Sequence, residues 1–404
     1  MPAGSYTPAA VTSNRSGASQ VIHVFLGTKA QYIKTAPLLR LLDARGIEYR
    51  LIDSGQHAAL SVGLREELGV RHPDHVLASG VDITSIPQAA VWAAKLFARL
   101  FDGRRLRREV FGGHGGVCVV HGDTPSTLLS TLMARRAGLQ VAHLEAGLRS
   151  KHLLHPFPEE LIRVVVMRIA HLLFAPDADA VANLRRMRVR GTIVPLPGNT
   201  VAEALDHELD AASAARPEPE VEVEAPDATA GRRAAAPDTG EGPQAPAIVT
   251  MHRVENLNRR ERVEALVATV ERIAATRPVR FVQHGPTIDT LRKRGLDARL
   301  RAAGVDLVAL APHGEFVGML AAAPFVITDG GSIQEECALL GVPTLLWRAA
   351  TERPDGVGAN VVVSGYDRAT VDRFLADPQS LRHPRVADRV KPSEVVLDHL
   401  LEYA

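Results

Sequence analysis

Acidic side chains follow two neighbouring apolar runs of the sequence, where carboxylates could exchange protons with a ligand. Asp123 follows the run in "VHGDTPSTLL", and Glu145 follows the run in "VAHLEAGLRS". The carboxyl ends of such strands are where α/β sheets expose functional side chains. Asp123 could instead cap the helix that contains Pro125, whereas no cap is required at Glu145. Paired acids of this kind predict acid/base chemistry.

Two further acids, Glu159 and Glu160, lie in "HPFPEELIR" directly after Pro158. Proline suits the first helical position, so both acids fall in the first turn of a helix. They could act in catalysis, or they could only complement the helix dipole.

The segment "TDGGSIQEECALLGVPTL" carries a phosphate-binding pattern. Gly330 and Gly331 allow close backbone approach, and a helix that opens near Ser332 offers free N–H groups to a diphosphate. Glu336 could accept from both hydroxyls of a nucleotide ribose, while Glu335 could serve the same site or only complement the dipole.

Histidines and lysines complete the candidate set. His252 and His284 end predicted strands, where each could meet a phosphate or a leaving group or could be a hydrogen-bonded core residue. Lys29 lies in a loop after the first strand, and Lys34 lies either in the same site or on a solvated helix face.

Short apolar runs alternate with helical stretches, which is typical of βαβ units and parallel, doubly wound sheets. We expect two Rossmann-like lobes of α/β class that face a cleft. The segment between them is rich in Ala, Pro and acidic residues and offers no core. The predicted divisions are a disordered tail (1–20), an N-terminal lobe (21–205), a flexible insertion (206–247), a C-terminal lobe with the nucleotide site (248–380) and a C-terminal helix (381–404) that could pack on either lobe.

Composition excludes several classes of protein. Lys and Arg number 47 against 46 Asp and Glu, so the net charge of +1 gives no global attraction to nucleic acid or to anionic membranes. Two cysteines cannot form a disulfide framework, and no Cys/His spacing resembles a zinc site. We therefore expect a soluble, cytoplasmic protein without a secretion signal or membrane span.

Laid out in order, these segments resemble the non-hydrolysing UDP-N-acetylglucosamine 2-epimerases, which have the glycosyltransferase-B fold. The resemblance runs from about Val21 to Glu402, apart from the insertion, and rests on nine ordered motifs. They are "GT…IK.APL" (27–38), "QH" (Gln56, His57), "HGDT" (121–124), "H.EAGLR" (143–149), "P.PEE..R" (156–163), "GNT" (198–200), "HR.E" (252–255), "TD.G.IQEE" (328–336) and "TERP" (351–354).

The resemblance implies an isomerase that converts UDP-GlcNAc to UDP-ManNAc. A carboxylate removes the C2 proton while UDP leaves C1, and UDP adds back to the glycal-like intermediate after reprotonation from the opposite face. No metal or other cofactor is needed, and the expected assembly is a homodimer in polysaccharide biosynthesis. By resemblance, Asp123, Glu145, Glu159 and His252 match the catalytic positions, and Lys34, Glu336 and Arg353 fall in the nucleotide-sugar site. We add to the expected substrate-binding residues Lys29, Arg163, His284, Gly330, Gly331 and Ser332.

Two departures leave the exact UDP-sugar open. Lys29, Ala30 and Gln31 stand where the family usually has Arg-Pro-Glu, and the family's "TDSGG" is here Thr328 to Ser332 in the order "TDGGS". A lysine cannot reproduce the bidentate phosphate contact of an arginine. The alternatives are a glycosyltransferase or a hydrolysing epimerase of the same fold, or a nucleotide-sugar-binding regulator without turnover.

Overall fold

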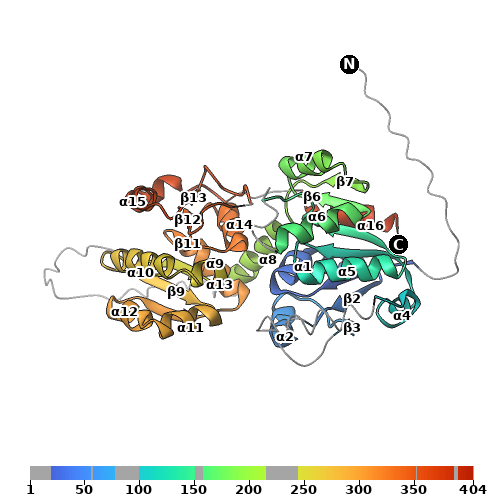
Figure 1. The fold of residues 1–404 in the computed structure, drawn as a ribbon, viewed down its shortest axis with the longest axis horizontal. Coiled ribbons are helices and arrows are strands. Elements are labelled where there is room, and N and C mark those ends of the chain that lie inside the picture. Colours follow the sequence, from blue (N-terminus) through green and yellow to red (C-terminus); the bar gives the residue numbers. More distant parts are fainter. Residues whose placement is uncertain are drawn as a thin grey trace, which may run out of the picture.

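The protein has two lobes, each built on a parallel β-sheet (Figure 1). The computed structural model describes residues 20–55, 58–77, 100–150, 158–214, 244–351, 353–385 and 390–403. Within these residues, the N-terminal sheet has seven strands in the order β3-β2-β1-β4-β5-β6-β7, and the C-terminal sheet has six in the order β10-β9-β8-β11-β12-β13. The predicted fold class of two doubly wound parallel-sheet lobes is confirmed.

The central strands are buried on both faces, as expected where helices cover both sides of a parallel sheet. All seven residues of β4 are buried, and so are all five of β8. The strands are β1 (Gln20–Leu26), β2 (Tyr49–Asp53), β3 (His75–Val76), β4 (Gly115–His121), β5 (Gln140–Leu144), β6 (Leu172–Ala175), β7 (Thr192–Pro195), β8 (Ala247–Met251), β9 (Val279–Gln283), β10 (Asp306–Ala309), β11 (Val326–Thr328), β12 (Thr344–Leu346) and β13 (Val361–Val363).

Helices pack on both faces of each sheet, and their apolar sides form the two cores of each lobe. The N-terminal lobe contains α1 (Lys29–Ala44), α2 (Ala58–Glu67), α4 (Gly103–Glu109), α5 (Pro125–Arg136), α6 (Glu159–Ile169) and α7 (Ala178–Met187). The C-terminal lobe contains α9 (Val254–Leu257), α10 (Arg260–Ala274), α11 (Gly285–Lys293), α12 (Leu296–Ala302), α13 (His313–Ala322), α14 (Gly331–Leu340), α15 (Arg368–Ala376) and a 3₁₀ turn (Pro378–Leu381).

Helix α8 (Val201–Ala214) lies between the lobes in Figure 1 and packs against α1, α13 and α14. The prediction of a flexible insertion from residue 206 is therefore wrong for residues 206–214, which belong to this helix. Leu205 and Leu209 of this helix pack into the core of the C-terminal lobe, and this burial stabilises a helix that composition alone did not indicate. Residues 215–243 of the predicted insertion lie outside the described residues.

The ends of the predicted divisions also need small corrections. Gln20 and Ala247, assigned to the tail and to the insertion, are the first residues of β1 and β8 because each pairs with a neighbouring strand. The last helix, α16 (Pro392–Leu401), returns to the N-terminal lobe, where Val396, Leu397 and Leu400 pack in the core beside α1. This answers the question of which lobe it joins.

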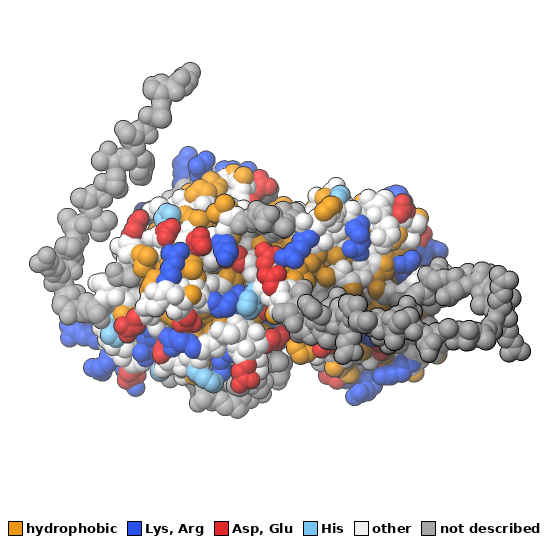
Figure 2. Space-filling model, turned by 180° about the vertical axis from the view of Figure 1, so that it is seen from behind, with side chains coloured by type: hydrophobic (Ala, Val, Ile, Leu, Met, Phe, Trp, Pro, Cys, Tyr) orange, Lys and Arg blue, Asp and Glu red, His pale blue; other side chains and the backbone are white. Residues whose placement is uncertain are grey.

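The face shown in Figure 2 carries acidic, basic and histidine side chains intermixed over the N-terminal lobe. This mixture agrees with the net charge of +1. Among the described residues, no helix is both long and apolar enough to span a bilayer.

Candidate active site

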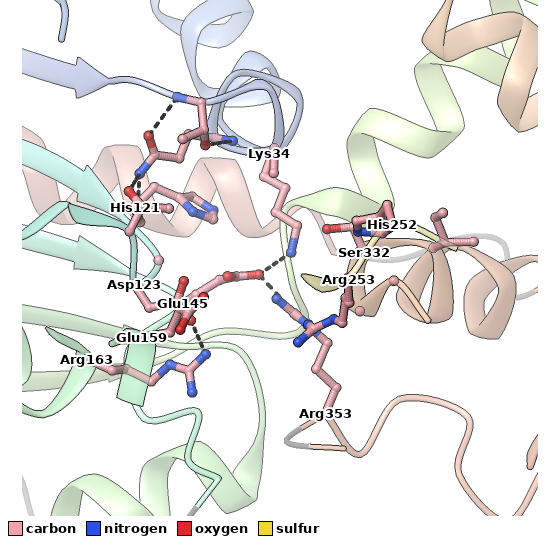
Figure 3. Close-up of a pocket in the computed structure, with 18 residues that line it drawn as sticks. Lys34, His121, Asp123, Glu145, Glu159, Arg163, His252, Arg253, Ser332 and Arg353 are labelled. Carbon is pink, nitrogen blue, oxygen red and sulfur yellow. Dashed lines mark hydrogen bonds and ion pairs between the residues drawn. The ribbon is translucent and has the colours of Figure 1, made fainter. Parts of the chain in front are cut away.

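A pocket between the lobes brings together ten of the thirteen predicted site residues (Figure 3). The N-terminal lobe contributes Lys34, Asp123, Glu145, Glu159 and Arg163 to its lining. The facing wall comes from the C-terminal lobe and contains His252, Gly330, Gly331, Ser332 and Arg353. Asp123, Glu145 and His252 follow the carboxyl ends of parallel strands, which is where sheets of this class bind ligands. Lys34 and Arg163 reach the pocket from within α1 and α6.

Asp123 is free for the pocket because another residue caps the following helix. Thr124 is the N-cap of α5 and forms a capping box with Thr127, so the alternative that Asp123 is the cap is wrong. The Asp123 carboxylate instead forms an ion pair with Arg163, whose guanidinium is buried.

The two acids that begin α6 have different environments. Glu160 is fully buried and accepts hydrogen bonds from Arg149, from Arg163 at 3.1 Å and from the Ser150 amide at 3.1 Å. Glu159 lines the pocket, and its buried Oε2 has no hydrogen-bond partner among the described residues. A buried carboxylate oxygen without a partner is costly unless a ligand satisfies it, so Glu159 is the acid of the pair that is available for chemistry.

A buried four-residue cluster joins the lobes at the pocket. Lys34 donates to Glu145 and, at 2.7 Å, to Glu335 of the other lobe. Arg353 Nη1 lies 2.9 Å from Glu335 Oε2 and 3.5 Å from Glu145 Oε1. Asn199 also donates to Glu145, with Nδ2 at 2.5 Å from Oε1. Figure 3 shows Lys34 and Arg353 converging on Glu145 from opposite lobes.

This cluster sets the ionisation of its two acids in opposite directions. Burial opposes ionisation of Glu145, but Lys34 and Arg353 outweigh it and hold the pKa of Glu145 well below its usual range. At Glu335, burial is the stronger effect and raises the pKa to about 7. Glu145 also has a φ of 60°, a left-handed conformation that is uncommon outside glycine, and such strain is concentrated at functional sites.

The wall formed by the C-terminal lobe contains the N-terminus of α14. Gly330 is the N-cap residue, and the first turn leaves N–H groups without helical partners. A Cβ on Gly330 would lie 2.8 Å from His252 Cε1, and one on Gly331 would lie 3.1 Å from Arg353 Nε. Only glycine therefore fits at Gly330 without moving the neighbouring ring, and this wall can bind an anion such as a diphosphate.

Asp329, which precedes this turn, holds the facing loop in place. Its carboxylate accepts from the amides of His252 and Arg253, each at 3.0 Å, and from Asn256 Nδ2 at 2.9 Å. His252 Nδ1 lies 3.3 Å from the same carboxylate, without the geometry of a hydrogen bond. Burial nevertheless lowers the pKa of His252, which favours the neutral imidazole.

Two buried histidines follow the same principle in the N-terminal lobe. Burial lowers the pKa of both His121 and His143 to about 4. His143 Nε2 donates to the Gly122 carbonyl at 2.8 Å, whereas Nε2 of His121, a pocket residue, has no partner among the described residues.

Three predicted site residues, Lys29, His284 and Glu336, do not line the pocket. His284 is the N-cap of α11, and its ring stacks on that of His252 with centroids 4.6 Å apart. Lys29 begins α1, and Glu336 lies one turn along α14 from Ser332. The predicted "QH" motif and Pro156 lie outside the described residues.

Sequence reasoning missed several residues of this site. Arg253 and His121 line the pocket, Asn199 contacts Glu145, and Asp329 positions the His252 loop. All four lie inside the quoted motifs, which is the signal that could have found them. For Glu335, the sequence allows a role in the site or one at the helix dipole, and its contact with Lys34 favours the site.

Gln31, which lines the pocket, connects the loops that follow β1 and β4. Its Nε2 donates to the His121 carbonyl at 2.7 Å and to the hydroxyls of Thr124 at 3.1 Å and Thr127 at 2.9 Å. Its Oε1 accepts from the Gly27 amide at 2.8 Å. Every hydrogen-bonding atom of this side chain therefore serves the loops that carry the site.

Within the described residues, no group of three or more His, Cys, Asp or Glu side chains is arranged to hold a metal ion. The pocket is lined by carboxylates, cationic side chains, imidazoles and the N–H donors of a helix start. Together they can exchange protons with a bound ligand and stabilise an anionic leaving group.

The chain is similar in sequence to known proteins. Residues 40–383 match the family model described as UDP-N-acetylglucosamine 2-epimerase. The UDP-N-acetylglucosamine 2-epimerase of Escherichia coli O157:H7 is 30% identical over 368 residues, covering 89% of this chain and 91% of that protein. The enzyme of that name from Methanocaldococcus jannaschii is 28% identical over 349 residues, 85% of this chain and 88% of the relative.

Solved structures show the same architecture. The crystal structure of the M. jannaschii UDP-GlcNAc 2-epimerase in complex with UDP-GlcNAc and UDP matches with a TM-score of 0.72 and 25% identity, over 95% of this chain and 100% of that chain. The Neisseria meningitidis UDP-GlcNAc 2-epimerase bound to UDP-GlcNAc has a TM-score of 0.75 at 22% identity over the same shares, which shows a common fold. The glycosyltransferase-B fold expected from the resemblance is confirmed.

Proposed function

The chain belongs to the UDP-N-acetylglucosamine 2-epimerase family, and we propose that it interconverts UDP-GlcNAc and UDP-ManNAc in the interlobe pocket. The observation that carries this proposal is the pairing of two walls. Asp123, Glu145 and Glu159 face the N-terminus of α14 and His252 across one pocket. Inversion at C2 requires proton exchange at carbon together with departure of a diphosphate, and each wall supplies one of these functions.

The carboxylates divide the proton chemistry. One carboxylate takes the C2 proton as the C1–O bond to UDP breaks, which leaves a C1–C2 double bond in a bound glycal. A second acid then returns a proton to C2 from the opposite face, and UDP adds back at C1. Asp123 and the free oxygen of Glu159 suit these two steps. Glu145, held ionised by Lys34, suits stabilisation of positive charge that develops at C1.

The other wall receives the leaving group. The N–H groups at the start of α14 and the arginines at positions 253 and 353 offer positive charge to the diphosphate. His252, beside Gly330, contacts the same region. Lys29 and His284 complete the proposed nucleotide-sugar site next to this wall.

Proton NMR in deuterated water tests the reaction directly. Purified protein incubated with UDP-GlcNAc should yield UDP-ManNAc that carries deuterium at C2. Asp123→Asn, Glu145→Gln and Glu159→Gln should each lower kcat by roughly 100-fold or more with little change in KM. The amides keep the shape of the side chains, but they remove the proton chemistry of Asp123 and Glu159 and the negative charge of Glu145. Glu315→Gln, at an exposed glutamate outside the pocket, is the matched control and should not change kcat.

Other products would identify a different reaction. Sugar transferred to an acceptor without deuterium at C2 would indicate a glycosyltransferase, and free sugar with UDP would indicate a hydrolysing epimerase. Full activity with all three amides in place would refute the mechanism.

The setting and assembly are part of the same proposal. A reducing, cytoplasmic compartment suits Cys118 and Cys337, which are both buried and free. We propose a homodimer, which sedimentation would test, and a product that supplies polysaccharide biosynthesis.

A further inference from the structure

A buried histidine outside the pocket lining lies between two carboxylates. His313 is the first residue of α13 and is 4% exposed. Its Nε2 lies 3.1 Å from Glu336 Oε1 on α14, and its Nδ1 lies 3.9 Å from Glu208 Oε1 on α8. The next amide, that of Gly314, donates at 2.7 Å to Glu67 at the end of α2 in the other lobe.

The environment of His313 favours the imidazolium. Burial by itself lowers the pKa of His313, but Glu208 and Glu336 outweigh burial and raise it to about 9. The charged groups that face it are Glu336 from α14 and Glu208 from α8, while Glu67 from α2 contacts the neighbouring Gly314 amide. At 3.9 Å, Glu208 acts through its charge, whereas the hydrogen bond of His313 goes to Glu336.

Glu336 has one oxygen engaged and one free. His313 holds Oε1, while the buried Oε2 has no hydrogen-bond partner within the described part of the chain. Glu336 follows Ser332 by four positions on α14, so both residues lie on the same face of the helix. Ser332 lines the pocket, and this face therefore leads from the diphosphate end of the site towards Glu336.

We propose that His313 is a positioning residue for ribose recognition: it fixes Oε1 of Glu336 so that Oε2 is presented to the ribose hydroxyls of a bound uridine nucleotide. The inference rests on the proposed function, because it takes UDP as the ligand. It assigns no chemistry to His313, which touches Glu336 and not the substrate. A histidine that only pins α13 to α8 and α14 would affect every ligand alike, and this difference makes the proposal testable.

The test compares UDP with 2′,3′-dideoxyuridine diphosphate, which lacks both ribose hydroxyls, by calorimetry at pH 7. His313→Leu should weaken UDP binding about tenfold, because Glu336 loses its donor and faces Glu208 without a cation between them. Binding of the dideoxy ligand should change by less than about twofold. His313→Gln should keep UDP affinity within about threefold of the wild type, because its amide can replace the Nε2–H donor.

The pH dependence gives a second measurement that does not need the leucine variant to fold. Wild-type preference for UDP over the dideoxy ligand should fall as the pH rises through about 9, where His313 loses its proton. His313→Gln should show no such fall. Both ligands carry the same base and diphosphate, so their own titrations cancel in the ratio.

Different outcomes would overturn the positioning role of His313 and the proposed function. Equal weakening of both ligands by His313→Leu, or a UDP preference in wild type that does not depend on pH, would overturn the positioning role. Failure of the wild-type protein to bind either uridine nucleotide would overturn the proposed function instead.

Discussion

Replacing Lys34 by methionine should destabilise the protein, because Lys34 is the cation shared by two buried acids. The side chains of Lys34, Glu145 and Glu335 are 3%, 7% and 2% exposed. Removing one partner of a buried ion pair typically costs about 3–5 kcal/mol. Arg353 stays within 2.9 Å of Glu335 and 3.5 Å of Glu145, so we expect the lower end, about 3 kcal/mol. Methionine keeps the length of the stem, which limits the cavity term.

Urea unfolding at pH 7 measures this change in the free energy of unfolding. Lys29→Met is the matched control on the same helix, since Lys29 has no ion pair among the described residues, and it should change stability by less than about 0.5 kcal/mol. Adding Glu335→Gln to Lys34→Met should recover part of the loss, because Arg353 then balances one buried carboxylate instead of two.

The loss of stability in Lys34→Met should depend on pH in a defined direction. In the wild type, the lowered pKa of Glu145 contributes stability above the usual glutamate range, and this is lost as the pH falls through its folded value. Without Lys34, burial favours the protonated form of Glu145 over the ionised form. The deficit of Lys34→Met should therefore shrink as the pH falls from 8 to 5. A loss below about 1 kcal/mol, or one that does not depend on pH, would refute the assignment of Lys34 as the shared cation.

Three further predictions concern residues 215–243, the buried His143 and the glycine turn at Gly330. Replacing residues 215–243 with a short Gly/Ser linker should leave kcat nearly unchanged, and a large loss would show that the segment takes part in catalysis. In the wild type, the pKa of His143 is lowered to about 4, so between about pH 4 and 6.5 this imidazole takes up a proton only when the protein unfolds, and the free energy of unfolding rises with pH. His143→Gln should make this rise less steep. An unchanged slope in urea titrations would contradict this. Gly330→Ala should displace the His252 ring and lower kcat/KM at least tenfold, whereas Gly318→Ala, where an added Cβ meets no atom within 4 Å, should have no effect; equal activities would contradict the close-approach argument.

The parts of the site that sequence could predict are those fixed by a strand. Asp123, Glu145 and His252 each follow an apolar run, and the parallel strands of each sheet bring their carboxyl ends to one edge of that sheet. Gly330 was found by the same argument, because a glycine turn between a strand and a helix has a local signature. Periodicity and turn chemistry are sufficient to place these residues at strand ends and at a helix start. They do not decide between the pocket and a helix cap for Asp123, or between the pocket and the core for His252, and the structure decides both.

Contacts that depend on how the lobes pack could not be predicted in this way. Lys34 and Glu335 are 301 positions apart, and no local pattern brings them together. The same holds for α8, whose residues after 205 resemble the Ala-rich and acidic segment that follows. Tertiary packing of Leu205 and Leu209 on the C-terminal lobe decides that this stretch is a helix.

Lys29, Ala30 and Gln31 stand where the family usually has Arg-Pro-Glu, and the changes at Lys29 and at Gln31 have different consequences. Gln31 is buried and donates from its amide nitrogen to the His121 carbonyl and to two threonine hydroxyls. An ionised glutamate has no such donor, so the change from the family's usual glutamate is accommodated by acceptors on the neighbouring strand-end loop and is a matter of scaffold. Lys29 begins the helix outside the pocket lining and makes no contact of this kind among the described residues. A lysine at this position cannot make the bidentate phosphate contact of an arginine. Restoring arginine should therefore change the use of UDP-GlcNAc without altering how the loops are held.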